Sequence, residues 1–377
     1  MPYITQLSKK NISEDIINHS KNKLLRFGIV GCGDISHVHG KAVSSIPNVH
    51  FVACADLNET RAEAWADQYE CERYFTDYHK MISEMALDGI VLATWPNQHL
   101  QQIKDCADGG IKNILCQKSL AITGAEAMEI WDVVNANDIF LMEGFMYRHH
   151  PALKKLESIV ADGEIGPVDN VRAVFSDYDP EEEDPDDTNR NWRQRKECGG
   201  GIPYDFACYA VNACGHFSNS LPVKVYASGG KSEKFDIINR MYGMVEYENG
   251  CVGIIESSKK SSFSQELQIS CANGILSLPI SWTIYDQVTI NQTFRRDWAE
   301  VFHYSFEIPH TDAYFQEMVN FVNVINNNDA PGMPLRETLV NIFVIEALVE
   351  SVLTKKIVDL ELPTRLIEYF NNNKERI

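Results

Sequence analysis

The sequence predicts two domains: an α/β domain built on a parallel sheet, then an α+β domain with an antiparallel sheet. Between residues 24 and about 146, apolar strand segments alternate with helical segments, as in parallel βαβ units. Farther on, Asn-Gly pairs at 249–250 and 273–274 separate strand segments, which indicates hairpins. The length of 377 residues suits about two domains. We expect them at 24–146 and 147–377, after a polar extension at 1–23.

The first domain follows from its order of elements. Each expected strand is a short apolar run, and each expected helix lies between two such runs. Thr123 is placed to cap the third helix. Strands are expected at 24–30, 50–55, 89–94, 113–116 and 139–142, and helices at 59–69, 97–107 and 123–134.

The second domain begins with a helix expected at 151–161, which has proline in its first turn. We expect the two Asn-Gly pairs to form type I′ turns. Strands are expected at 171–176, 223–227, 245–248, 251–255, 267–271, 275–278 and 287–290, and helices at 312–325 and 336–353.

Composition excludes several classes of protein. Lys plus Arg is 34 and Asp plus Glu is 53, a net charge of −19, which argues against nucleic acid or a membrane surface as the partner. No apolar run reaches the ~18 residues of a transmembrane helix, and residues 1–23 lack the apolar core of a signal peptide. The ten cysteines form no C-x-x-C pair. Reduced thiols without an export signal predict a cytoplasmic protein.

A glycine loop follows the first strand. Gly31-x-Gly33-x-x-Ser36 matches the dinucleotide-binding pattern, in which the first glycine permits a tight turn and the second a close approach of the pyrophosphate. Ser36 is small enough for close helix–strand packing. Asp56 ends the second strand 20 residues after Ser36, where a carboxylate binds the adenine ribose hydroxyls. Because a carboxylate repels a 2′-phosphate, we expect NAD rather than NADP.

Four further motifs resemble one enzyme family. They are Thr-Trp-Pro-Asn-Gln-His at 94–99, Cys-Gln-Lys-Ser-Leu-Ala at 116–121, Glu-Gly-Phe-Met-Tyr-Arg at 143–148, and the 191–209 segment with its Gly-Gly-Gly run. With the glycine loop, they resemble the glucose-fructose oxidoreductase / inositol dehydrogenase / rhizopine catabolism (Gfo/Idh/MocA) family over about residues 24–360. The Asp205-x-x-x-Tyr209 spacing is most similar to the branch with xylose dehydrogenase, dihydrodiol dehydrogenase and glucose-fructose oxidoreductase.

The resemblance implies a Rossmann domain, a large open sheet that is mainly antiparallel, and an active site between them. It implies an NAD(P)-dependent oxidoreductase that transfers a hydride between the nicotinamide cofactor and a sugar, cyclitol or related polyol. It also implies a homo-oligomer, dimer or tetramer, assembled through the sheet. Two alternatives stay open: a non-catalytic NAD(P)-binding regulator, and an NAD-dependent glycosidase.

The expected cofactor contacts come from the glycine loop, the strand ends and the motifs. A turn accounts equally well for Pro96, and a packing role for His99. The expected contacts are Gly31, Gly33, Asp34, Ile35, Ser36, Asp56, Thr94, Trp95, Pro96, Asn97, His99, Gln117 and Lys118.

Three residues are expected to carry the chemistry. Asp205 and Tyr209 are four residues apart and share a helix face, and Lys118 matches the lysine of the family's Glu-Lys-Pro motif. We expect Tyr209 to exchange the proton with the substrate oxygen, poised by the Lys118 charge, while Asp205 orients a hydroxyl or Lys118. A neutral Lys118 acting as base, with Tyr209 orienting, is the alternative.

The family's glutamate is Gln117 here and its proline is Ser119. Gln117 keeps the hydrogen-bonding shape of a glutamate but loses the charge that could pair with Lys118.

We expect substrate binding from residues that combine aromatic faces with cations, and from two of the catalytic residues. For Tyr147, Arg148, Trp192 and Arg193, packing between the domains explains the sequence equally well. The expected substrate-binding residues are Tyr147, Arg148, Trp192, Arg193, Asp205 and Tyr209.

No metal site is expected. Neighbouring His149 and His150 would point apart on a helix, with no carboxylate spaced to join them. The segment 177–187 has eight acids in eleven residues, but it lacks the glycine and closing glutamate of a calcium loop. We expect it to be a solvated loop; the alternative is a rim of the active site that disfavours acidic substrates.

Overall fold

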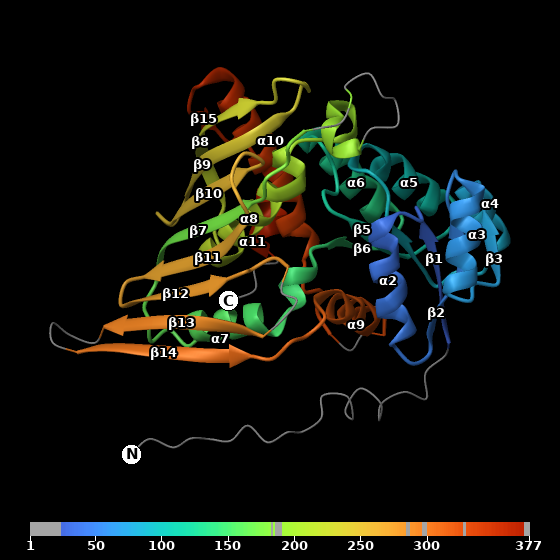
Figure 1. The fold of residues 1–377 in the computed structure, drawn as a ribbon, viewed down its shortest axis with the longest axis horizontal. Coiled ribbons are helices and arrows are strands. Elements are labelled where there is room, and N and C mark those ends of the chain that lie inside the picture. The colour runs from blue at the N-terminus through green and yellow to red at the C-terminus, as the bar shows by residue number, and fades with distance from the viewer. Residues whose placement is uncertain are drawn as a thin grey trace, which may run out of the picture.

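The computed structural model describes residues 24–181, 184, 191–283, 287–295, 300–326 and 329–372. Two sheets lie at opposite ends of the long axis of the molecule (Figure 1), with helices between them. The expected extension at 1–23, and residues 182–183 and 185–187 of the acidic segment, lie outside the described residues.

The first sheet has six parallel strands in the order β3-β2-β1-β4-β5-β6. This is the doubly wound order of a Rossmann domain, and it confirms the predicted fold class. Its elements in chain order are β1 (Leu25–Val30), α2 (Asp34–Ser44), β2 (Val49–Ala55), α3 (Glu59–Gln68), β3 (Arg73–Phe75), α4 (Tyr78–Glu84), β4 (Gly89–Leu92), α5 (Pro96–Asp108), β5 (Asn113–Gln117), α6 (Gly124–Ala136) and β6 (Phe140–Gly144).

Most of these elements match their expected positions. Every residue of β4 is buried, as expected for a central parallel strand whose two faces are covered by helices. Thr123 caps α6 in a reciprocal capping box with Glu126. Sequence analysis missed β3 and α4. Two of the three residues of β3 are exposed, so it lacks the apolar run used to find strands.

The second sheet has nine strands in the order β14-β13-β12-β11-β7-β10-β9-β8-β15. Only the central β7–β10 pair is parallel, so the predicted mainly antiparallel sheet is confirmed. Its strands are β7 (Val168–Ser176), β8 (Pro222–Lys231), β9 (Ile238–Tyr247), β10 (Val252–Ser258), β11 (Ser264–Cys271), β12 (Gly274–Pro279), β13 (Val288–Arg295), β14 (Val301–Ile308) and β15 (Val358–Asp359).

Both predicted hairpins form, but the predicted type I′ turns are wrong. In the first, Gly250 N–H donates to Tyr247 O at 2.9 Å, and only Gly250 of the Asn-Gly pair has a positive φ, 86°. This is a three-residue loop with glycine in the left-handed position. In the second, Cys271 pairs with Gly274, so the glycine belongs to β12. A tertiary contact helps to set the conformation of the first turn, because the Asn249 side-chain amide donates to Ser218 O at 2.9 Å.

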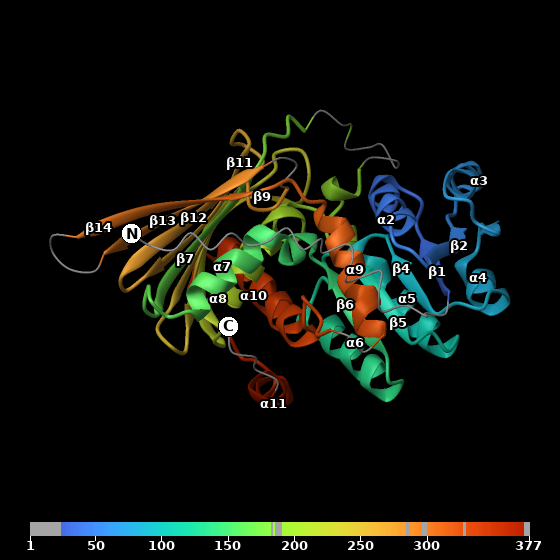
Figure 2. The same cartoon turned by 90° about the horizontal axis from the view of Figure 1, so that it is seen from below.

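Helices from the second half join the two sheets (Figure 2). α8 packs against β7 and β10, and α10 packs against α8, β8 and α6. α9 packs against α2 of the first domain. These helices are α7 (Pro151–Ala161), α8 (Cys208–Ser218), α9 (Ala313–Ile325), α10 (Leu335–Thr354) and α11 (Thr364–Asn372). Within the described ranges, we find no helix with the length and hydropathy needed to cross a bilayer.

The described part of the acidic segment agrees only in part with the solvated loop that was expected: Asp177 and Asp184 are exposed, but Asp179 and Glu181 are not. Glu181 is 4% exposed, and it accepts hydrogen bonds from Asn239 and Ser232. Asp179 pairs with Lys259 at 3.2 Å. Carboxylates with such partners are structural, because an ion pair or hydrogen bond offsets the cost of burying them.

Candidate active site

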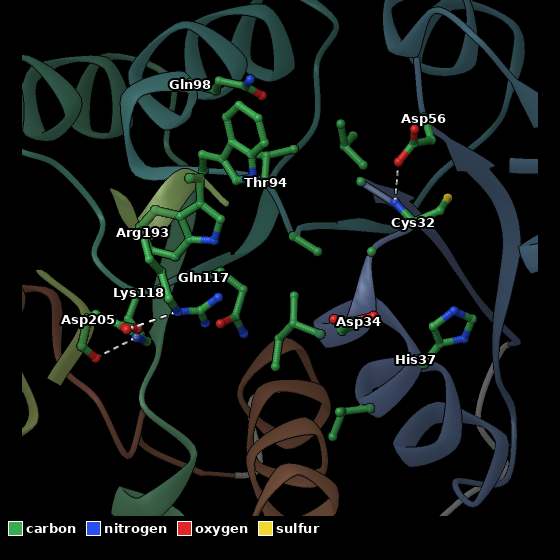
Figure 3. A pocket seen from close by; sticks show the side chains of 18 of the residues that line it. Cys32, Asp34, His37, Asp56, Thr94, Gln98, Gln117, Lys118, Arg193 and Asp205 are labelled. Atoms are coloured by element: carbon green, nitrogen blue, oxygen red, sulfur yellow. Dashed lines mark hydrogen bonds and ion pairs between the residues drawn. The ribbon is translucent and has the colours of Figure 1, made fainter. Parts of the chain in front are cut away.

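A large cavity, about 1670 Å³ in volume, lies at the carboxyl ends of β1 and β4 and is lined by residues of both halves of the chain. Strand order reverses between β1 and β4, and ligands of open α/β sheets bind at such a switch point. Figure 3 shows the cavity between the glycine loop on one side and Lys118, Arg193 and Asp205 on the other.

The glycine loop leaves room for a phosphate group. Gly31 has a φ of 90°, and a Cβ there would lie 2.7 Å from Ala93 O, so only glycine fits. A Cβ built on Gly33 would meet no described heavy atom within 4 Å. Gly33 is also the N-cap of α2, which lacks a side-chain cap. The positive end of α2 therefore faces the open cavity, and this geometry fits a dinucleotide pyrophosphate.

Asp56 lines the cavity and is tied to the glycine loop. Its Oδ2 accepts the Cys32 N–H at 2.9 Å, and its Oδ1 accepts the Asn58 N–H at 2.8 Å. Arg61 Nη1 lies 3.5 Å from Asp56 Oδ2, and Arg61 also lines the cavity. A cation therefore lies beside the carboxylate, which sequence analysis did not expect because Arg61 belongs to helix α3.

Lys118 and Asp205 meet at the other end of the cavity (Figure 3). Lys118 follows β5, and Asp205 lies in a π-helical turn, Pro203–Ala207, that leads into α8. Lys118 Nζ donates to Asp205 O at 2.7 Å and to Asp205 Oδ1 at 3.1 Å. This ion pair therefore connects the two domains at the end of the cavity.

Two further cations reach the Asp205 carboxylate. Arg193 Nε donates to Oδ2 at 2.9 Å, and Lys259 Nζ lies 3.6 Å from the same oxygen. Burial alone would raise the pKa of Asp205, but Lys118, Arg193 and Lys259 hold it well below its usual range. Asp205 is therefore ionised. Sequence analysis missed Lys259, which lies just beyond β10 and far from every motif.

Tyr209 presents the face of its ring to Lys118. Lys118 Nζ lies 5.2 Å from the ring centroid, and the Tyr209 hydroxyl points to Met146 Sδ at 3.6 Å. Tyr209 is 5% exposed, and burial raises the pKa of its hydroxyl well above the usual value. The sequence-based expectation was that the Lys118 charge would poise this hydroxyl. Since the cation lies over the ring, that effect is not found.

Four aromatic residues that were not among the expected site residues also line the wall of the cavity. The Trp282 Nε1–H donates to Val174 O at 2.7 Å, which fixes the indole. The Phe175 and Phe206 rings stack 4.2 Å apart, and Tyr314 comes from α9. These four residues line the cavity. Trp192 and Arg193 do so as expected, with the guanidinium 4.9 Å above the indole.

Most expected site residues line the cavity. They are Gly31, Gly33, Asp34, Ile35, Asp56, Thr94, Trp95, Asn97, Gln117, Lys118, Trp192, Arg193, Asp205 and Tyr209. Ser36, Pro96 and His99 do not. Ser36 Oγ donates to Gly33 O at 2.5 Å, and His99 Nδ1 lies 3.0 Å from Ser119 O. Burial lowers the pKa of His99 to about 4. These residues support the loops around the cavity.

The structure does not bring Tyr147 and Arg148 to the cavity, contrary to expectation. They are 1% and 2% exposed. The Tyr147 hydroxyl and Arg148 Nη1 both donate to Asn212 Oδ1, and Arg148 pairs with Glu337 at 2.6 Å. Asn212 lies on α8, three residues after Tyr209. The π-helical turn changes the phase of the helix after Asp205, and Asn212 faces the buried pair.

Gln117 contacts a buried histidine. Its amide nitrogen lies 2.8 Å from His39 Nε2, and burial lowers the pKa of His39 to about 4. A neutral imidazole can accept a hydrogen bond from an amide, whereas an ionised glutamate has no proton to donate. The amide at this position therefore suits a neutral His39. The Lys118–Ser119 peptide bond is cis.

Two family models match the chain. The model described as "Oxidoreductase family, NAD-binding Rossmann fold" matches residues 25–145, and the "GFO/IDH/MocA C-terminal domain" matches residues 153–277. Among curated relatives, D-xylose 1-dehydrogenase (NADP(+)) 2 of Haloferax volcanii is 27% identical, over 89% of this chain and 100% of the relative. Myo-inositol 2-dehydrogenase of Thermotoga maritima is 21% identical, over 89% and 99%.

Solved structures share the fold. Levoglucosan dehydrogenase in complex with NADH has a TM-score of 0.80 at 20% identity and covers 90% of this chain and 100% of that one. KijD10, a 3-ketoreductase from Actinomadura kijaniata solved with NADP and TDP-benzene, has a TM-score of 0.76 at 19% identity, over 88% and 98%.

Proposed function

Because the chain belongs to the GFO/IDH/MocA family of NAD(P)-dependent oxidoreductases, we propose that it interconverts a CH–OH group and a carbonyl of a neutral sugar, cyclitol or related polyol. The observation that carries this proposal is the meeting of Lys118, Asp205 and Tyr209 at the end of a cavity whose other end is the glycine loop. Curated relatives named as xylose and inositol dehydrogenases support the substrate class.

Different residues of the cavity would hold different parts of the cofactor. NAD(P), when bound, supplies the carbon that accepts or gives the hydride. Gly31, Gly33 and the start of α2 would hold its pyrophosphate, and Asp56 its adenine ribose. Trp282, Phe175 and Tyr209 form an apolar wall that excludes water from the reacting carbon.

Lys118 is the better placed of the two candidate proton-exchanging groups. Its ammonium lines the cavity and can donate to the substrate oxygen while Asp205 holds it in place. Tyr209 offers its ring to Lys118 and its hydroxyl to Met146, and a raised pKa keeps that hydroxyl protonated. We therefore propose that Lys118 exchanges the proton, as an ammonium when a carbonyl is reduced and as a neutral amine when an alcohol is oxidised, and that Tyr209 positions it; the alternative drawn from the sequence was a neutral Lys118 acting as base.

NAD is the proposed physiological cofactor. Asp56 lines the cavity and would accept the 2′- and 3′-hydroxyls of the adenine ribose, while repelling a 2′-phosphate. Arg61, 3.5 Å from Asp56, weakens that repulsion. Family members of both kinds occur, since one relative's name specifies NADP and one solved structure holds NADH.

Turnover with a panel of sugars tests the proposal. The purified protein is given NAD or NADP with neutral aldoses, ketoses and cyclitols, while reduced nicotinamide is followed by absorbance. We expect one substrate class to reduce NAD, and Lys118→Ala to abolish this while cofactor binding persists. NAD binding without turnover of any sugar would overturn the oxidoreductase assignment in favour of a regulator. Sugar release without net reduction of cofactor would favour a glycosidase.

We also propose that residues 147–377 form the substrate-binding and oligomerisation domain, and that two copies join through the outer face of the nine-stranded sheet. α8 and α10 cover one face of that sheet. The other face exposes the large side chains Tyr226 (44%), Tyr242 (43%), Met244 (48%) and Ile254 (36%). A contiguous apolar patch of this kind marks an interaction surface, and a second copy presents a matching one.

The ten cysteines are free thiols. Free thiols persist in reducing compartments, which supports a cytoplasmic location as part of this proposal.

A further inference from the structure

A second cavity, about 350 Å³ in volume, lies at the C-terminal end of α8, the helix whose N-terminal end carries Tyr209. Side chains from α7, α8, α10 and α11 line it, together with the turn before α10. Its volume falls within the ~300–1,000 Å³ typical of small-molecule pockets. None of its lining residues belongs to the cofactor cavity.

Alternating charges run along the wall of this cavity. Lys154 Nζ lies 3.0 Å from Glu157 Oε2, and His216 Nε2 lies 2.8 Å from Glu157 Oε1. His216 Nδ1 lies 3.5 Å from Glu337 Oε2, which in turn pairs with Arg148 at 2.6 Å. Glu157 and Glu337 are thus each held between a cation and His216.

Both carboxylates are ionised and are already paired with neighbouring basic side chains. Burial alone would raise the pKa of Glu157, but His216 and Lys154 lower it to about 2. Burial opposes ionisation of Glu337 in the same way, yet Arg148 and His216 hold its pKa well below the usual range. The two acids neutralise two of the three cations that line the cavity.

The third cation, Arg336, has almost no partner. Its residue is 8% exposed, and its one polar contact among the described residues is Glu337 Oε1 at 3.8 Å from Nη2. A buried guanidinium with free N–H groups is costly. An acceptor inside the cavity would relieve that cost.

The N-terminal end of helix α10 adds positive electrostatic potential to this cavity. Arg336 lies in the first turn of α10, a 20-residue helix without a side-chain cap, and Pro334 and Arg336 of this turn line the cavity. The positive end of a long helix favours an anion. Arg148, Lys154 and Arg336 line the cavity together with Glu157 and Glu337, so three side-chain cations face two carboxylates there.

We propose that this cavity binds a small monocarboxylate through the Arg336 guanidinium, with Arg148 and Lys154 beside it. The planar guanidinium of Arg336 can donate two parallel hydrogen bonds to one carboxylate. A phosphate dianion would meet Glu157 and Glu337 with a second negative charge. Arg148 also contacts Asn212, which accepts from Tyr147, so the site adjoins the packing behind Tyr209.

Calorimetric titration tests the site in the NAD-saturated protein, so that the glycine loop and the start of α2 cannot take the anion. The probes are sodium acetate and sodium propionate, which lack the CH–OH group of the proposed substrates, with sodium phosphate as comparator and sodium chloride as the ionic-strength control. We expect saturable binding of at least one carboxylate, weaker binding of phosphate, and none of chloride. Binding does not require turnover, so this result is independent of the proposed reaction.

Two variants and a matched control decide the outcome. Arg336→Gln should weaken carboxylate binding at least about tenfold, the order expected for one lost charge-assisted contact. Lys154→Gln, whose side chain is 49% exposed, should weaken it without risk to folding. Arg365→Gln on α11 removes a guanidinium that faces Asp132 instead and should change nothing. Unaltered affinity in both cavity variants, absence of carboxylate binding to wild type, or tighter binding of phosphate would overturn the proposal.

Discussion

Lys118 Nζ lies 5.2 Å above the centre of the Tyr209 ring, while the Tyr209 hydroxyl points away to Met146. The lysine therefore meets the π-face of the tyrosine, an arrangement worth about 0.5–2 kcal/mol, and its remaining hydrogen bonds go to Asp205. This geometry separates two chemical roles that the sequence left open, because a hydroxyl that faces Met146 is poorly placed to share a proton with Lys118.

The first prediction separates these roles. Tyr209→Phe keeps the ring under Lys118 and removes only the hydroxyl, so we expect kcat to fall less than about tenfold. Lys118→Ala should lower kcat by about 10²–10⁴-fold, the usual contribution of a general acid or base. Steady-state kinetics with the substrate found in the sugar panel measure both, with NAD affinity as the control. A larger loss of kcat in Tyr209→Phe than in Lys118→Ala would assign the proton exchange to Tyr209.

The second prediction concerns Asp205. Asp205→Asn keeps the shape but leaves Lys118, Arg193 and Lys259 without their shared counter-charge. Removing one partner of a buried ion pair costs about 3–5 kcal/mol, so we expect a loss of that order in the free energy of unfolding. Denaturant unfolding measures it. Asp162→Asn, at an exposed position, should be neutral, and a neutral Asp205→Asn would show that the three cations do not depend on this carboxylate.

The third prediction concerns cofactor choice. Asp56→Ser removes the carboxylate and frees Arg61, which lies 3.5 Å away. We expect the ratio of NADP to NAD affinity to rise at least about tenfold, because repulsion of the 2′-phosphate is replaced by attraction. Fluorescence titration with each reduced cofactor measures the ratio. Glu59→Gln, at an exposed site on α3, the helix that carries Arg61, controls for a general change of charge. An equal change in the affinity ratio for this variant would refute the specific role of Asp56.

The fourth prediction concerns pH. The Glu157 pKa is lowered from 4.5 to about 2 in the folded protein. A lowered folded-state pKa gives stability that is present above pH ~4.5 and lost as pH falls toward ~2. Since one pKa unit corresponds to about 1.4 kcal/mol, up to about 3 kcal/mol is at stake.

Glu157→Gln should therefore be less stable than wild type at pH 7 and lose less stability between pH 4.5 and 2. Urea unfolding at a series of pH values measures both slopes. Glu164→Gln, at an exposed acid just after α7, should leave the slope as it is. Parallel curves for wild type and Glu157→Gln would contradict the lowered pKa.

The fifth prediction concerns assembly. Met244→Glu places a charge in the exposed apolar patch that includes Tyr226, Tyr242 and Ile254, and burying that charge at an interface is costly. We expect this variant to be monomeric by light scattering while keeping the wild-type circular dichroism spectrum. Tyr74→Glu, on the exposed edge strand β3, should assemble as wild type does. An unchanged mass for Met244→Glu would place the interface elsewhere.

Much of the fold could be predicted because it depends on local patterns. Apolar runs separated by helical segments specify a parallel sheet, and the strand, the glycine loop and Asp56 occur in the order that a dinucleotide site requires. β3 escaped prediction because it is three residues long and two of them are exposed. At the first turn, the Asn249 side chain bonds to Ser218, which is distant in sequence; in the second hairpin Gly274 belongs to β12.

The sequence by itself determined the two fold types, the glycine loop, and the set of Lys118, Asp205 and Tyr209. The fold types and the glycine loop rest on spacing along the chain, which fixes backbone geometry within a few residues; the set of Lys118, Asp205 and Tyr209 was implied by the resemblance to the family. Only the tertiary structure decided that Lys118 meets the face of Tyr209, that Lys259 reaches Asp205, and that Arg148 turns away from the cofactor cavity. These depend on how side chains from distant elements share one volume and one set of charges, and local spacing does not encode that.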